Sequence, residues 1–525
     1  MKPLYAFLLV ASAAVAVAAP APAYTTVPTG NVSLPAGNYE ASVGGLSYGN
    51  GNGFHSEYYI VAGTLTIVPA TTLIVYPWTS ADGVTPFELQ RKDVVSLLRA
   101  TNGITGTFQT IQSPGFVHWV LFDNSASATH RYGNLYGTGL LPNQTFADYG
   151  TNASRRIVGQ GLWDAAVRVS TAGKAGFIDS ATVPGQVAIG LMAATNLDAT
   201  LDALSPEPYQ AVGDYGIFAM RAAVDGIGAG LPFYEKHHWT ATLAYQQAGV
   251  TEAGLSSAAF EHRMQADTTV VRMTYDFSAT SLVSVYYGAN SGQVASSMAT
   301  SDIRGSFFGL DLEARPWTGQ PLKFRLSALH AGLHAATARQ ANPLGLSGGQ
   351  QAVVTPGASS SVDQSINGFA TEATVSYDLC DTARWKFGPY ASFFHGSSKV
   401  GAVTETGAGA SLSVGASDQT LSSGSLGLAA KFESGSGWNV NGSIGYEHIF
   451  SSSASALSAT FVGGAGSAAP MVLPGHAATG SLVAARLGLG YSFDRFTGVA
   501  LDFGLRSGDQ VNAESRVGLS FASRF

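Results

Sequence analysis

Few residues of this sequence have the type and spacing that catalysis requires. Residues 45–49 (GLSYG) match the G-x-S-x-G pattern, in which the serine, here Ser47, attacks an acyl carbon. The pattern needs a strand before the serine and a helix after it, whereas residues 49–53 (GNGNG) cannot start a stable helix. In a chain rich in glycine and serine we interpret the match as chance, and we expect no enzyme and no catalytic residue.

The histidines and the cysteine are poorly spaced for metal binding. His237 and His238 are adjacent, so they point to opposite faces of an extended chain. His330 and His334 share a parity at the end of a predicted strand, where a surface metal site is the less favoured interpretation. Cys380 is the only cysteine, which excludes an intrachain disulfide and a multi-cysteine metal site. We expect no metal and no cofactor.

Length and composition favour a membrane protein built from strands. The chain has 525 residues, too many for one ordinary domain, and only 12% of them are charged, about half the usual share. It has 63 glycines and, after the N-terminus, no run of the ~20 apolar residues that a membrane helix needs. The net charge of −7 gives no reason to expect nucleic-acid binding.

The N-terminus has the features of a secretory signal peptide. Lys2 is followed by an uncharged apolar run from Leu4 to Ala19, which is short for a membrane span. Ala21 and Ala23 form a small-residue cleavage signal. We therefore predict that residues 1–23 are removed and that Tyr24 becomes the first residue.

Residues 24–150 contain short runs of β-forming residues between glycine-rich turns. The clearest runs cover 58–68, 71–78, 103–111 and 116–124, and residues 86–100 have the composition of one short helix. We predict a β-roll or a short β-solenoid for this region. The pattern changes at residues 151–235, where 154–171, 186–204 and 206–227 have helical spacing.

From residue 236 onward the apolar residues recur with a period of two, which predicts strands. The last strand shows the pattern well, because Val517, Leu519, Phe521 and the terminal Phe525 share one face. We interpret these four residues as the signal for barrel insertion. The predicted strands form an antiparallel set of twelve: 239–245, 271–277, 283–287, 308–314, 322–328, 369–377, 385–393, 426–432, 438–446, 487–493, 499–505 and 514–525.

The charged residues of these strands lie on the parity opposite the apolar residues. An arginine or lysine that faces lipid near the midplane costs about 2–4 kcal/mol, and a lumen removes that cost. Parity alone does not separate a barrel from a soluble sandwich. The residues concerned are Arg272, Asp276, Asp311, Glu313, Arg315, Lys323, Arg325, Glu372, Asp378, Lys386, Lys431, Glu447, Arg486, Asp502, Arg516 and Arg524.

The lengths of the connections favour the barrel. Long connections are predicted at 250–267, 290–303, 335–365, 397–420 and 451–480. Short ones are predicted at 279–281, 316–320, 380–383, 434–437 and 494–496. Long external loops that alternate with tight periplasmic turns are typical of an outer-membrane barrel. The first strand then starts at the periplasmic side, and the segment before it is placed to enter the pore.

At this point the chain resembles an autotransporter of the type V secretion route. The resemblance rests on LDALSPEPYQAVG at 201–213, RWKFGPYASFF at 384–394, YEHIF at 446–450 and the terminal strands. It implies a signal peptide (1–23), a β-roll or short β-solenoid passenger (24–150), a helical linker (151–235) and a barrel (236–525). A pore helix at about 206–227, containing Tyr209, Tyr215, Phe218, Met220 and Arg221, would thread the barrel. The alternative interpretation of this helix is a periplasmic packing helix or part of the passenger stalk.

The resemblance also implies a location and partners. The barrel would stay in the outer membrane as a monomer, and the passenger would reach the cell surface, with adhesion as a role. Membrane lipid, periplasmic chaperones and the barrel-assembly machinery would be its partners. Two alternatives remain open: an exported serine hydrolase anchored by a barrel, and a pore in which residues 24–230 form a periplasmic or plug domain.

Overall fold

The computed structural model divides the chain into two compact units, which we describe separately. The first comprises Met1–Gln144 and Val167–Ser180, and the second Thr145–Ala166 and Ala181–Phe525. The structure describes residues 30–43, 59–77, 94–106, 109–112, 119–123, 131–137, 144–169, 176–178, 182–194, 196–227, 238–252, 262–278, 281–315, 321–340, 359–382, 384–407, 410–463, 470–475, 477–509 and 513–525. The predicted signal peptide, its cleavage residues Ala21, Ala23 and Tyr24, and Ser47 lie outside these residues.

The first unit is built on parallel strands stacked in two columns. One column is β1 (Val32–Leu34), β4 (Leu65–Ile67) and β7 (Ile104–Thr105); the other is β2 (Gly37–Val43), β5 (Thr71–Pro77) and β8 (Thr110–Gln112). Leu65 pairs with Val32 on one side and with Ile104 on the other. Leu34, Leu65, Ile67 and Ile104 are buried, so the stack encloses a small apolar core. These rungs confirm a short β-solenoid.

A second sheet of the first unit corrects one prediction. It has the order β3 (Tyr59–Val61), β6 (Val94–Ala100), β10 (Arg131–Gly137) and β9 (Trp119–Asp123). The helix predicted for 86–100 is wrong over residues 94–100, which form β6. This strand pairs with β3 and β10, and partners on both sides outweigh the local helix propensity. The helix predicted for 154–171 ends at Ala166. The next residues form β11 (Val167–Val169), which pairs with β12 (Gly176–Ile178).

The helices of the second unit precede its barrel. A 3₁₀ turn (Phe146–Tyr149) packs on α1 (Ala153–Ala166) through Phe146 and Trp163, whose ring centroids are 4.9 Å apart. The helix predicted for 186–204 is two helices, α2 (Val183–Ala193) and α3 (Leu197–Ala203). The Asn196 side chain accepts a hydrogen bond from the backbone amide of Ala199 and is the N-cap of α3. α4 (Glu207–Ile227) follows, as predicted. No helix in the described ranges has the length and apolarity to span a membrane.

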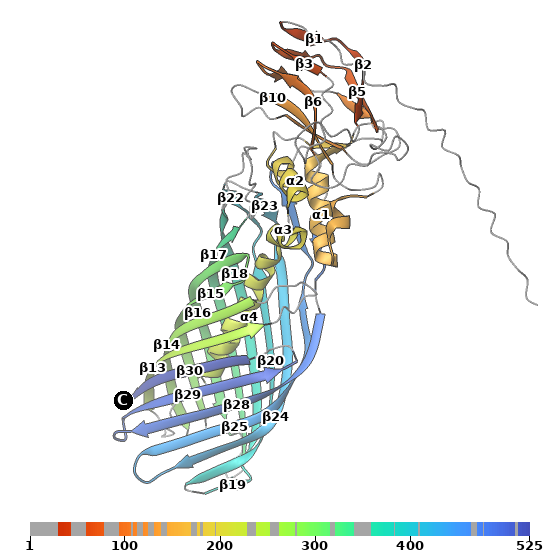
Figure 1. The fold of residues 1–525 in the computed structure, drawn as a ribbon. Coiled ribbons are helices and arrows are strands. Elements are labelled where there is room, and N and C mark those ends of the chain that lie inside the picture. Colours follow the sequence, from red (N-terminus) through yellow and green to blue (C-terminus); the bar gives the residue numbers. More distant parts are fainter. Residues whose placement is uncertain are drawn as a thin grey trace, which may run out of the picture. The chain divides into compact units, whose positions relative to one another are not determined.

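The twelve predicted barrel strands are all present, and they close. Each neighbours the next in antiparallel order, and the last strand pairs with the first through Leu243 and Phe521. Closure leaves no open edge, which hydrocarbon does not tolerate (Figure 1). The strands are β13 (His238–Glu252), β14 (His262–Ser278), β15 (Ser281–Ala295), β16 (Ala299–Ala314), β17 (Leu322–Gln340), β18 (Ser359–Tyr377), β20 (Trp385–Val400), β24 (Ser417–Glu433), β25 (Trp438–Ala454), β28 (Ala477–Ser492), β29 (Thr497–Gly508) and β30 (Ala513–Arg524).

Short strands accompany the barrel at both ends. At the end with tight turns lies β19 (Cys380–Asp381). At the opposite end β22 (Thr406–Gly407) pairs with β18, and the long connections form a sheet of their own. That sheet has the order β21 (Val403–Thr404), β23 (Leu412–Val414), β26 (Leu457–Phe461) and β27 (Met471–Leu473), and α1 packs on β26 and β27.

The charged residues face inward, as their parity predicts. All those identified from the sequence are buried or half-buried, and Asp276, Asp311 and Glu447 are each 1% exposed. The opposite parity is outward and apolar; for example, Leu426 is 68% exposed and Phe308 58%. A soluble sandwich would reverse this arrangement, because its exposed face would carry the charges.

Toward the long-loop end, the polarity of the two faces reverses without a change of parity. On β18 the outward residues Asp363, Ser365 and Asn367 are polar and exposed, while inward Ile366 and Ala370 are buried and apolar. The strands therefore continue beyond the apolar belt as a stem with a core of its own. The long connection predicted at 290–303 is wrong for this reason: β15 and β16 are joined at 296–298, where the Ser296 amide donates to the Ala299 carbonyl (2.9 Å).

Candidate functional site

The candidate site is the lumen of the barrel, which α4 occupies. The helix contacts β13–β18, β20 and β24 and lies inside the barrel (Figure 1). Val212, Tyr215 and Phe218 of the helix belong to the same buried apolar cluster as Ile303 and Ile366 of the wall. The helix thus completes the core of the stem. Neither the helix nor the stem wall could bury its apolar face without the other.

Small residues let α4 approach the wall closely. A Cβ atom on Gly216 would overlap the hydroxyl of Ser398 on β20. Wall side chains also bond to the helix backbone: Gln419 Nε2 donates to the Gln210 carbonyl (2.6 Å), and Gln246 Nε2 to the Ala222 carbonyl (3.0 Å). These contacts hold the helix at one depth in the lumen.

The N-terminal end of α4 is fastened by a buried ion pair. Arg339 of β17 meets Glu405 in two parallel bonds, Nε–Oε1 (2.7 Å) and Nη2–Oε2 (2.6 Å). Tyr209 of α4 donates its hydroxyl to the same carboxylate, and Arg339 Nη1 donates to the carbonyl of Ala203 at the end of α3 (2.7 Å). The group joins a barrel strand, a long connection and two helices.

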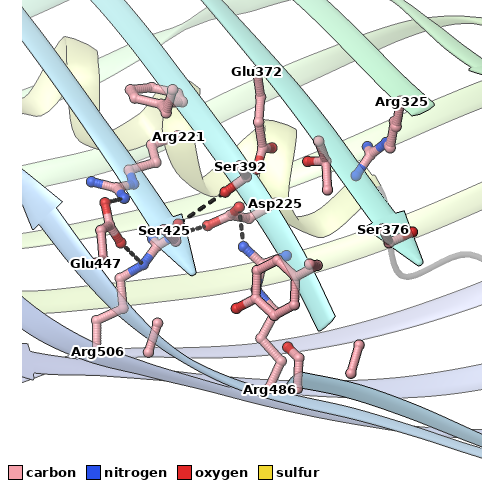
Figure 2. A pocket seen from close by; sticks show the side chains of 16 residues that line it. Arg221, Asp225, Arg325, Glu372, Ser376, Ser392, Ser425, Glu447, Arg486 and Arg506 are labelled. Carbon is pink, nitrogen blue, oxygen red and sulfur yellow. Dashed lines mark hydrogen bonds and ion pairs between the residues drawn. The ribbon is translucent and has the colours of Figure 1, made fainter. Parts of the chain in front are cut away.

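The C-terminal half of α4 is held by a network of opposite charges. Asp225 of α4 is bound by Arg486 of β28 and Arg506 of β29 (Figure 2). Arg516 of β30 lies 3.4 Å from the same carboxylate. Arg221, one turn earlier, pairs with Glu447 of β25. Charges buried without partners cost several kcal/mol each, so this network fixes the helix as long as it stays complete.

Beside the helix lies a polar cavity of about 220 Å³. Arg221 and Asp225 of α4 line it together with Glu372 and Arg486 of the wall (Figure 2). Tyr390 belongs to the same lining. In the described part of the chain, no group of three or more His, Cys, Asp or Glu side chains is placed to hold a metal ion. His330 and His334 are exposed on β17, His238 is half-buried on β13, and His237 lies outside the described residues.

At the long-loop end, a cluster of α1, α3 and α4 surrounds the start of the pore helix. Arg155 of α1 donates to both carboxylate oxygens of Asp202 (2.7 Å each) and pairs with Asp198 (3.0 Å). Glu207, the first residue of α4, is buried beside them. Burial raises the pKa of Glu207 to about 7, against the opposing effects of the Ser154 hydrogen bond and the charge of Arg155.

The proposed insertion residues lie on the closing strand. Val517, Leu519, Phe521 and Phe525 are all exposed on the outer face of the barrel. Phe525 and Trp239 exchange backbone hydrogen bonds of 2.9 and 3.2 Å and so complete the seam at the tight-turn end. Their role in insertion stays a prediction.

The comparisons with known proteins identify the barrel. Residues 275–504 match the model of the autotransporter β-domain, a stretch from β14 to β29. The C-terminal barrel belongs to the autotransporter β-domain family. The outer membrane is therefore the location of this autotransporter barrel. Among curated proteins, none matches the chain.

Three solved structures show the range of similar proteins. The translocator domain of the autotransporter NalP from Neisseria meningitidis is 12% identical, with 61% of this chain and 97% of that chain covered and a TM-score of 0.44. The transport unit of the autotransporter AIDA-I from Escherichia coli is 10% identical, with coverages of 60% and 99% and a TM-score of 0.34. An outer membrane channel from Pseudomonas putida F1 is 10% identical, with coverages of 56% and 97% and a TM-score of 0.30.

The sequence analysis missed the residues that fasten the two ends of α4. Arg339 and Glu405 both fell in predicted long connections, although each is a rare charge in a polar, charge-poor segment. Asp225 was not singled out, although it is an acid in an otherwise apolar half-helix with Arg221 one turn earlier. An unexplained charge on a helix that enters a lumen is the signal that could have found them.

Proposed function

We propose that this protein carries its own N-terminal region across the outer membrane and displays it at the cell surface. The proposed passenger comprises residues 24–150, after removal of a signal peptide at 1–23. The observation that carries the proposal is α4, which occupies the lumen and directly precedes the first barrel strand.

The direction of α4 supports outward passage. Its N-terminal end bonds to Glu405 in a long connection, and from there the helix runs into the barrel, where Asp225 near its C-terminal end meets Arg486 within β28 (Figure 1). The long connections are external and the tight turns periplasmic in barrels of this kind. A chain that has passed outward through the pore would leave its last segment in this orientation.

The contacts of α4 also suit a pore that closes after transport. The hydrophobic stem core and the Asp225 network both require the helix in place. Without it they would leave apolar surface in water and buried charges unpaired. We infer that α4 stays in the lumen as a plug once the passenger is outside.

For the passenger we propose a class of role without naming a ligand. A stack of parallel strands offers an elongated contact surface, and adhesion to another surface is the role we favour over catalysis by Ser47. We further propose a monomer that needs periplasmic chaperones, the barrel-assembly machinery and outer-membrane lipid, without cofactor or nucleic acid.

Protease treatment of intact cells tests the display. With epitopes inserted at residues 45–55 and at the turn 434–437, added protease should remove the first and spare the second. Protection of both epitopes in intact cells, with cleavage after lysis, would instead support the pore with a periplasmic or plug domain. A serine-reactive probe that labels the surface protein and fails on Ser47→Ala would support the hydrolase.

A further inference from the structure

The tight-turn end of the lumen contains a second cavity, which the transport of a passenger does not explain. It has a volume of about 520 Å³ and is separate from the Arg339–Glu405 pair at the other end. We call it the vestibule. Its ionisable lining comprises the cations Arg315, Lys323, Lys386, Lys431, Arg486 and Arg516 and the acids Asp378, Glu433 and Asp502.

Positive charges exceed negative ones in this lining, and some acidic side chains pair with more than one cation. Asp378 is 3.1 Å from both Arg315 and Lys323, and Glu433 pairs with Lys431. Arg486 and Arg516 already bind Asp225 at the end of α4. Even when Asp225 is counted with the lining, six cations face four acids.

The lysines repel one another across the wall. Lys386 of β20 and Lys431 of β24 are direct cross-strand partners, and both point inward and are half-buried. Lys323 of β17 lines the same cavity. Like charges directly opposite each other destabilise an antiparallel pair, and partial burial strengthens the repulsion. An anion between these lysines would turn repulsion into attraction.

We propose that the vestibule binds a phosphate-class oxyanion, held by Lys323, Lys386 and Lys431. Lysine ammonium groups bind phosphate as compact point charges with several donors. Ser376, Asn441 and Ser443 in the same lining supply neutral hydrogen-bond donors. The oxyanion could be a soluble phosphate or the headgroup of a phospholipid at the periplasmic rim. The proposal is independent of passenger display, since it concerns only the folded barrel.

Binding is measured on the full-length protein, folded in an amine-oxide detergent that contains no phosphate. Inorganic phosphate is titrated at constant ionic strength against chloride, with calorimetry as the readout. A second titration uses short-chain phosphatidylglycerol. The test variant is Lys386→Gln/Lys431→Gln, which keeps the side-chain bulk. The control is Lys399→Gln, which removes an exposed lysine from the outer face of the same strand, β20.

The wild type and the control should bind with equal affinity, and the double variant should bind at least tenfold more weakly. Heat-modifiable migration verifies that each variant is folded. Lysine-dependent binding of inorganic phosphate assigns the site to a soluble ligand, and lysine-dependent binding of phosphatidylglycerol alone assigns it to a headgroup. Equal affinities in the wild type and the folded double variant, or no binding of either probe, would overturn the proposal.

Discussion

Arg339 and Glu405 form a two-point ion pair in which both side chains are 0% exposed. Arg339 belongs to β17 and Glu405 to the long connection after β20, and the Leu412 amide also donates to Glu405 Oε2 (2.7 Å). Tyr209 of α4 donates its hydroxyl to the Glu405 carboxylate, so the pair also binds the start of the helix. It therefore couples the position of the helix to the fold of the outer connections.

Breaking this pair from one side should destabilise the outer end. Arg339→Met leaves the Glu405 carboxylate buried without its partner, at an expected cost of about 3–5 kcal/mol. Arg339→Met/Glu405→Leu should recover most of that loss, because no buried charge is left. Limited proteolysis of the outer connections and thermal unfolding of the folded protein measure both effects. A single variant as resistant as the wild type would contradict the role of the pair.

Removing the acid at the other end of α4 should loosen the plug. Asp225→Asn leaves Arg486, Arg506 and Arg516 without the carboxylate that they share. We expect a larger and noisier current through the variant in planar bilayers. Asp363→Asn, which changes an exposed acid on the outer face of β18, is the control and should conduct like the wild type. Equal currents in all three proteins would show that the network does not hold the helix.

A disulfide should trap α4 in the lumen. A Cβ on Gly216 would lie 3.2 Å from the Ser398 Cβ, slightly below the usual disulfide spacing of about 3.5–4.5 Å. In a Cys380→Ser background, Gly216→Cys/Ser398→Cys should cross-link on oxidation and migrate faster in denaturing gels. Gly216→Cys/Ser365→Cys places the second cysteine on the exposed outer face and should stay uncross-linked. Similar cross-linking of both pairs would argue against α4 in the lumen.

Deleting Phe525 should reduce barrel assembly. The deletion removes the two backbone hydrogen bonds with Trp239 that complete the seam, together with an interfacial aromatic that is 66% exposed. We expect less heat-modifiable protein in the membrane fraction. Leu426→Ala, which truncates an exposed residue in the middle of the wall, should assemble normally. If the deletion variant gave as much heat-modifiable barrel in the membrane fraction as the wild type, Phe525 would not be needed for assembly.

The helical cluster around Glu207 should weaken as the pH rises. Because the pKa of Glu207 is raised to about 7 from 4.5, the folded cluster holds a proton that the unfolded chain releases. Its stability is therefore highest below about pH 4.5 and falls until the pH exceeds 7, by at most about 3 kcal/mol. Hydrogen exchange of α1 and α3 between pH 5 and 8 measures the change.

Glu207→Gln provides the matched control for this pH dependence. The amide has nearly the shape of the protonated acid but does not titrate, so the stability of the cluster should become nearly independent of pH in this range. The same decline in Glu207→Gln as in the wild type would assign the effect to another group.

The membrane part of the barrel could be predicted from the order of the residues alone. Lipid excludes charge, so every residue that faces it must be apolar, and this constraint can be seen strand by strand in the order of the residues. The period of two, the inward parity of residues such as Asp311 and Glu447, and the closing strand at Phe525 could all be predicted for that reason. Helix α4 could be predicted from its spacing in the same way.

The ends of the strands and the contacts that hold the helix depend on how distant parts of the chain pack together. Beyond the membrane the outward face meets water, and the apolar face turns toward α4, so the local pattern that predicted strands no longer applied at 290–303. The pairing of Arg339 with Glu405, and of Asp225 with Arg486, Arg506 and Arg516, joins residues far apart in the chain. Such pairs depend on barrel closure and on the depth of the helix, which no local pattern specifies.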